Sequence, residues 1–249
     1  LNIIKESPFE FSENTRNLIL SEVFFLLIIK PVERNAFNFP LRDEEDNIIT
    51  GRWVFQDKKL YRDIFFQRQP IPTILSGSVQ KLTKPNTIYI LIKRHRDFIL
   101  FYSFLFAAAL IVRFGLPAFI TALVLELTKF TLLGNLFHAE SLLIYPLIYV
   151  LGVLYSRYKS KKLPFYDIAA FAFLLPFIIF TREHLIIFAS FVFLITYRKL
   201  PKAKKRQLSI ACLAGLILFL LFQMPFVSFI SYIKNILPVN LFDFIPAEA

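Results

Sequence analysis

The chain of 249 residues contains 56% hydrophobic residues but only 19% charged residues, with 31 phenylalanines and 6 glycines. A soluble domain carries about 25% charged residues, and one of this length cannot bury so much apolar surface in a single core. The apolar content excludes disorder, the few glycines exclude collagen, and the single Cys212 excludes a disulfide scaffold. These exclusions leave a polytopic membrane protein, and the lack of period-2 alternation predicts that it is all-α.

The net charge of +11 results from 29 Lys and Arg against 18 Asp and Glu. In a soluble protein this balance would indicate nucleic-acid binding. In a membrane protein, Lys and Arg mark the cytoplasmic loops instead, so we expect no nucleic-acid partner. We treat residues 1–249 as a single transmembrane domain, and the lack of an evident end signal favours an N-terminal fragment of a longer protein.

Apolar stretches predict about seven transmembrane helices, because one span needs roughly 20 apolar residues. The first stretch, 17–32, is weak because Glu22 and Lys30 lie within or near it. Residues 33–87 are polar and form the first extracytoplasmic loop, and 71–92 is expected to lie on the outer membrane surface. The remaining predicted spans are 97–113, 116–133, 141–155, 164–181, 185–197 and 208–224.

Two basic clusters, in 157–162 and 198–206, set the expected orientation, because both loops should be cytoplasmic. The turn 181–184 between them is then outside. One basic cluster, 93–96, conflicts with this scheme because it lies at the outer end of a span. A span over 74–92 would place that cluster inside but would reverse the later loops. Charged residues expected together on the outer face are Asp43, Glu44, Arg94, Arg96, Glu140, Arg182 and His184.

Four consecutive acidic residues, 43–46, begin an imperfectly amphipathic segment that continues to Phe55. This pattern predicts a helix on the membrane surface with acids at its N-terminus, where the helix dipole favours ionised carboxylates. One interpretation is an acidic helix cap without further function. The other is a carboxylate general base at the water–membrane boundary, which takes a proton from an incoming hydroxyl.

Three sequence features lie in the predicted outer loops. The first is Asp43-Glu44 followed by Tyr61-Arg62-Asp63 and a Pro-containing turn. It resembles the first outer loop of GT-C glycosyltransferases, which include the dolichyl-phosphate-mannose mannosyltransferase-like group. The second, Phe137-His-Ala-Glu140, lies where that family commonly has another acidic residue. The third, Thr181-Arg182, lies where the family often has Thr-Lys.

The resemblance implies a GT-C-like helix bundle with juxtamembrane helices in the first outer loop. It implies that Asp43 is the catalytic base, with Glu44 as the alternative because the acids adjoin. Glu140 would orient the substrate or a cation, and Arg182 would meet the lipid phosphate. The remaining substrate-binding candidates are Tyr61, Asp63, Arg94, Arg96, His138 and His184.

The implied reaction transfers a sugar from a polyprenyl-phosphate donor to a hydroxyl of a lipid, glycan or protein acceptor, with inversion. It would occur on the extracytoplasmic side of the cell membrane, in contact with membrane lipids. The sequence has no Gly-rich loop for a nucleotide-sugar and no His/Cys cluster with metal-ligand spacing. Some GT-C enzymes use a divalent cation and others do not, so the metal remains open and no other cofactor is expected.

Two further functional classes compete with the glycosyltransferase. A transporter or lipid flippase should have charged or broken helices near the bilayer midplane, often in repeated halves. Only Glu126 and Lys129 meet that description, and their spacing favours a structural pair that neutralises itself. In a non-catalytic membrane subunit, neutralising the outer acidic residues together would leave function unchanged.

Overall fold

The computed structural model describes residues 13–35, 44–132, 134–159 and 164–236, and within these ranges the chain is helical without a strand. The all-α expectation is therefore confirmed for this part of the chain. The longer helices are α1 Glu13–Asn35, α2 Glu45–Val54, α3 Pro70–Thr83, α4 Ile88–Phe114, α5 Leu116–Thr128, α6 Ala139–Tyr158, α7 Phe165–Thr181, α8 Ile186–Arg198 and α9 Lys202–Gln223. Three shorter elements are η1 Glu183–Leu185, α10 Phe229–Ser231 and η2 Tyr232–Ile236.

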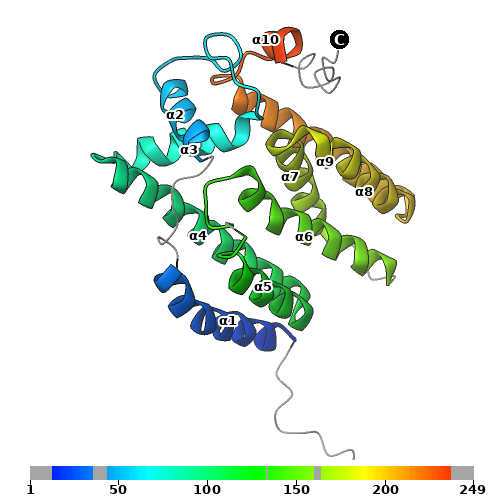
Figure 1. Ribbon diagram of the computed structural model, residues 1–249. Coiled ribbons are helices and arrows are strands. Elements are labelled where there is room, and N and C mark those ends of the chain that lie inside the picture. The colour runs from blue at the N-terminus through cyan, green and yellow to red at the C-terminus, as the bar shows by residue number, and fades with distance from the viewer. Residues whose placement is uncertain (1–12, 36–43, 133, 160–163, 237–249) are drawn as a thin grey trace, which may run out of the picture.

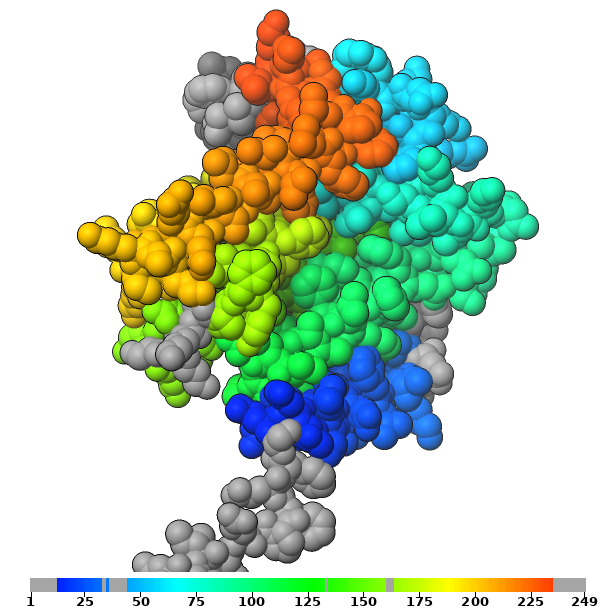
Figure 2. Space-filling model, turned by 180° about the vertical axis from the view of Figure 1, so that it is seen from behind, coloured from blue at the N-terminus to red at the C-terminus, as the bar shows by residue number. Residues whose placement is uncertain are grey.

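Helix α4 is the centre of the bundle, and it contacts α1, α5, α6 and α3. Helix α7 packs against α6, α8 and α9 on the other side, while α2 and α3 pack on each other and cover one end (Figure 1). Residues after α9 return to this end, where the Leu60 N–H donates to the Phe226 carbonyl at 2.9 Å. Figure 2 shows this end from behind, with the orange and red atoms of α9 and α10 beside the cyan atoms of the α2–α3 segment. We refer to this end of the bundle as the α2–α3 end.

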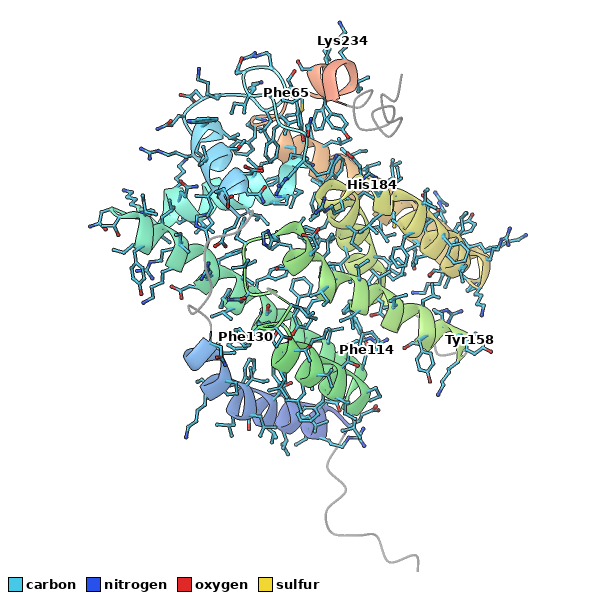
Figure 3. All side chains as sticks on the ribbon, in the orientation of Figure 1. Phe65, Phe114, Phe130, Tyr158, His184 and Lys234 are labelled. Carbon is cyan, nitrogen blue, oxygen red and sulfur yellow. The ribbon has the colours of Figure 1, made fainter. Side chains whose placement is uncertain are left out.

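The opposite end gathers the loops that the sequence predicts to be cytoplasmic, and we refer to it as the basic end. Arg157 Nη2 donates to the Lys199 carbonyl at 2.7 Å, which joins the two basic loops. Arg113 at the end of α4 forms a bidentate pair with Asp167 of α7, at 3.0 and 2.7 Å. Figure 3 shows Phe114 and Tyr158 at this end, away from His184. Parts of three loops that the sequence predicts to be cytoplasmic thus lie at one end of the bundle, while the membrane topology itself stays a prediction.

Three of the described helices are long and apolar enough to cross a membrane: α4 with 27 residues, α6 with 20 and α9 with 22. Helices α5 and α7 are apolar but have only 13 and 17 residues. At 1.5 Å per residue, α5 spans about 20 Å, against a hydrocarbon layer of about 30 Å. All seven predicted helices are present, but the count of seven membrane spans is not confirmed.

Segment 71–92, predicted to lie on the membrane surface, is divided into two helices. Lys84 ends α3 with a left-handed backbone, at φ 44° and ψ 57°. Thr87 then caps α4, because its side chain accepts the N–H of Ile90 at 3.2 Å. The span expected over 97–113 therefore belongs to a helix that starts at Ile88, and the basic cluster lies within its first turns. A continuous span over 74–92 is excluded by the break at Lys84.

Large apolar side chains cover much of the outer surface of the helices. Examples are Phe101 of α4, Ile187 of α8 and Leu218 of α9, which are 66%, 78% and 65% exposed. Soluble monomers rarely expose contiguous apolar area on this scale, whereas lipid-facing surfaces do. This distribution is consistent with a membrane protein.

The backbones of α7 and α9 are close together at Gly215, where an added Cβ would clash with the Ala172 carbonyl oxygen. We expect Gly215→Ala to lower the free energy of unfolding by about 1–3 kcal/mol, because a helix backbone cannot rotate away. Gly152→Ala is the matched control, since the three atoms nearest to its added Cβ all belong to the Phe114 ring, a side chain that can move, and the nearest is 2.9 Å away. Thermal unfolding in detergent measures both, and equal losses would contradict the close backbone contact.

Candidate functional site

The acidic run that begins α2 is anchored to three other parts of the chain. Glu44 is fully buried, and its carboxylate pairs with the buried Arg96 of α4 at 2.7 Å. The other Glu44 oxygen accepts the Phe137 N–H at 2.9 Å. Further along the run, Asp46 pairs with Arg68 at 3.0 Å. One short acidic segment therefore fixes the α2–α3 end to α4 and to the chain entering α6.

A second buried polar contact joins α3 to α4 next to this anchor. His95 is fully buried, with its ring nitrogens 2.8 Å from the Ser76 hydroxyl and 2.8 Å from the Leu91 carbonyl. Its ring also meets the Phe137 ring edge-on at 4.9 Å. Sequence reasoning did not find this contact, because His95 stands in a basic run that is typical of a solvated surface.

A cavity of about 580 Å³ lies beside this anchor, between α4, α5, α6 and the end of α7. Its volume falls within the range of small-molecule sites, about 300–1,000 Å³. Four partly exposed side chains form what we call the rim: Arg68, His138, Glu140 and Arg182. Four buried polar side chains form what we call the floor: Glu126, Lys129, Ser141 and Tyr145.

The rim is organised around an ion pair between Glu140 and Arg182, which connects the first turn of α6 to the end of α7. Both side chains remain solvent-accessible, at 66% and 41%. Exposed ion pairs of this kind contribute only about 0–1 kcal/mol to stability. Arg182 can therefore exchange Glu140 for another anion at little cost.

Three of the predicted site residues, His138, Glu140 and Arg182, line this one cavity. The predicted base Asp43 lies outside the described residues. Glu44 and Arg96, which the sequence predicted to act on a substrate, are instead buried and form an ion pair with each other. The remaining four are outside the cavity lining: Arg94 pairs with Asp97 at 3.6 Å, His184 is exposed on η1, and Tyr61 and Asp63 lie in the loop between α2 and α3.

Tyr61 and Asp63 shape the loop between α2 and α3. Tyr61 has a left-handed backbone with φ 69°, and its hydroxyl donates to the Arg68 carbonyl at 2.8 Å. Burial, with Tyr232 and Glu183 nearby, raises the pKa of Tyr61, so the phenol stays protonated as a donor. Asp63 accepts from Arg62 Nε and the Lys59 N–H, both at 2.9 Å. These bonds lower the pKa of Asp63 to about 2, so it stays ionised.

A further contact that the sequence did not indicate connects α3 to the turn after α7. Gln69 donates to Glu183, and Tyr232 also donates to Glu183, at 2.7 Å. The Tyr232 ring lies 4.9 Å from that of Tyr61. Burial, followed by hydrogen bonding to Glu183, raises the pKa of Tyr232 to about 12. Residues from three distant parts of the chain thus hold this loop in place.

Within the described ranges, no group of three or more His, Cys, Asp or Glu side chains is placed to hold a metal ion. Comparisons with protein-family models, curated proteins and solved structures found no match to this chain. The geometry of the cavity is therefore the basis for a functional assignment.

Proposed function

We propose that the chain is a membrane glycosyltransferase of the GT-C type, which transfers a sugar from a polyprenyl-phosphate donor to an acceptor hydroxyl. The observation that carries the proposal is the anchoring of the acidic run at the cavity. Asp46 pairs with Arg68, which lines the cavity. Glu44 binds the N–H of Phe137, the residue before the rim histidine, His138. Carboxylates and a cationic rim thus occur together, as sugar transfer from a phosphate requires.

The cationic side of the reaction is assigned to Arg182. When the bond between the anomeric carbon and the donor phosphate breaks, both bonding electrons leave with the phosphate. A guanidinium can stabilise that charge with two parallel hydrogen bonds. The exposed pairing of Arg182 with Glu140 leaves it able to turn toward the donor.

The acidic side is assigned to Asp43, the neighbour of the anchored Glu44. The acceptor oxygen forms its bond to the anomeric carbon on the face opposite the phosphate, which inverts the configuration. The acceptor proton passes to the Asp43 carboxylate as a general base. Glu44 is not available for this step because it is bound to Arg96 and Phe137.

The proposed setting is a multi-pass protein of the cell membrane with the cavity on the extracytoplasmic side. The basic loops lie at the end opposite the cavity, as they should if they face the cytoplasm. The donor lipid would remain in the bilayer while its sugar phosphate reaches the rim.

The test is release of polyprenyl phosphate when membrane-embedded protein is incubated with several polyprenyl-phosphate sugars and acceptor lipids. We expect release by the wild type and a loss of about 10²–10³-fold in kcat for Arg182→Gln. Arg206→Gln, an exposed arginine of α9, is the matched control and should keep wild-type activity. Uptake of a solute into vesicles without any glycosyl product would instead favour a transporter.

A further inference from the structure

The cavity floor contains polar groups that the proposed chemistry does not use. Glu126 and Lys129 form an ion pair one turn apart at the end of α5, and their side chains are 1% and 9% exposed. The Tyr145 hydroxyl donates to Glu126 Oε1 at 2.5 Å. Among the described residues, the buried Ser141 hydroxyl has no hydrogen-bond partner. All four side chains line the same cavity as Arg182.

These groups have hydrogen-bonding capacity left over. An ammonium has three donors and a carboxylate has about four acceptor positions. The Lys129 ammonium meets Glu126 on one side and the Phe104 and Phe130 rings at 6.0 and 5.7 Å. A buried ion pair is well compensated only when further hydrogen bonds satisfy its remaining groups. A ligand in the cavity can supply those bonds.

The chemistry of the floor fits adjacent hydroxyl groups. The Glu126 carboxylate accepts from an O–H, the Lys129 ammonium donates to a hydroxyl oxygen, and the Ser141 hydroxyl does either. The pair carries no net charge. Because Glu126 and Lys129 already neutralise each other, a charged sugar would bring an uncompensated charge into this buried site, which costs more than burying hydroxyl groups.

Building on the proposed function, we propose that the floor is the sugar-binding subsite of the donor and that it selects a neutral sugar with adjacent free hydroxyls. The phosphate meets Arg182 at the rim, and the ring extends inward toward Glu126, Lys129 and Ser141. Glu126 and Lys129 are then specificity-determining residues in addition to their contact with each other. Tyr145 is a positioning residue that holds the Glu126 carboxylate.

The decisive variant is Ser141→Ala, because its hydroxyl makes no bond within the described chain and its removal should not affect folding. We expect it to weaken binding of a polyprenyl-phosphate hexose about fivefold to tenfold. KM should rise while kcat is unchanged, as expected for binding that is equal in ground and transition states. Thr196→Val is the matched control, because Thr196 is also buried without a partner among the described residues but does not line the cavity.

A second variant, Glu126→Gln, tests the charge selection, and thermal unfolding verifies that it folds. We expect this variant to bind the neutral donor at least tenfold more weakly than the wild type does. We also expect it to discriminate less strongly than the wild type against a donor whose sugar carries a carboxylate. One monodeoxy donor should bind Ser141→Ala and wild type equally, because the hydroxyl that Ser141 meets is already missing. Equilibrium binding of the labelled donor to protein in detergent measures all three effects.

The outcomes separate the two proposals. If the wild type releases polyprenyl phosphate but Ser141→Ala and folded Glu126→Gln bind every donor as the wild type does, the floor inference is wrong and the enzyme assignment stands. If the wild type neither binds nor turns over any sugar donor, the enzyme assignment is wrong and the inference falls with it.

Discussion

Replacing Arg96 with Met is expected to lower the free energy of unfolding by about 3–5 kcal/mol, which is the cost of leaving one partner of a buried ion pair unpaired. Glu44 would remain fully buried with a single N–H donor, that of Phe137, in place of the guanidinium. The loss should appear as a lower midpoint of thermal unfolding in detergent. It should also appear as faster proteolysis between α2 and α3, which Glu44 anchors to α4.

Arg94→Met is the control for this prediction, because Arg94 is two residues away on the same helix and its side chain is 50% exposed. We expect a change within about 0.5 kcal/mol. The double variant Glu44→Leu with Arg96→Met should recover much of the loss, since apolar pairs often replace buried ion pairs without cost. Equal effects of Arg94→Met and Arg96→Met would contradict the anchoring role.

Replacing Asp43 with Asn is expected to lower kcat of sugar transfer by about 10²–10⁴-fold, the usual contribution of a general base. The expectation rests on the proposed function and on the neighbouring Glu44, whose carboxylate is already bound to Arg96. The free energy of unfolding should change by no more than about 1 kcal/mol, which is the usual size of a charge effect at a helix N-terminus. Steady-state release of polyprenyl phosphate, together with thermal unfolding of the same sample, measures both quantities.

Two variants make this result specific. Asp57→Asn is the matched control, because Asp57 is exposed and has φ 65°, a conformation that asparagine also tolerates. It should keep full activity. Glu44→Gln should lose stability, and any loss of activity should follow the loss of folded protein. An active Asp43→Asn variant would remove the base assignment.

The sequence predicted the helices well because each carries its own local pattern. The acidic run preceding an amphipathic segment indicated α2, and the apolar stretches between basic loops indicated α6 to α9. Helix ends were less predictable where a single side chain decides them. One example is α4, which begins at Ile88 because Thr87 caps it. The predicted span started at 97 instead, because the basic cluster 93–96 argued against a membrane span there.

The site was only partly predictable from the sequence. The sequence predicted that His138, Glu140 and Arg182 belong to one site, because all three lie in predicted outer turns. The structure places all three in the lining of one cavity. Which acid of the run points inward could not be read, because Glu44 finds its partner Arg96 at a distance of 52 positions along the chain. Local spacing carries no information about such contacts. The same holds for Ser141, whose relation to Glu126 depends on where the bundle places α5 and α6 around the cavity.

The Glu44 anchor also has a consequence for how a ligand reaches the cavity. The Glu44 carboxylate holds the start of α2, helix α4 and the chain before α6 together. Moving the α2–α3 end away from the bundle would therefore separate the buried charges of Glu44 and Arg96, which is costly. The exposed pair of Glu140 and Arg182, by contrast, separates at a cost of about 1 kcal/mol or less. If the cavity binds the donor as proposed, we expect ligand exchange to proceed through local opening at the rim, while the α2–α3 end stays fixed to α4.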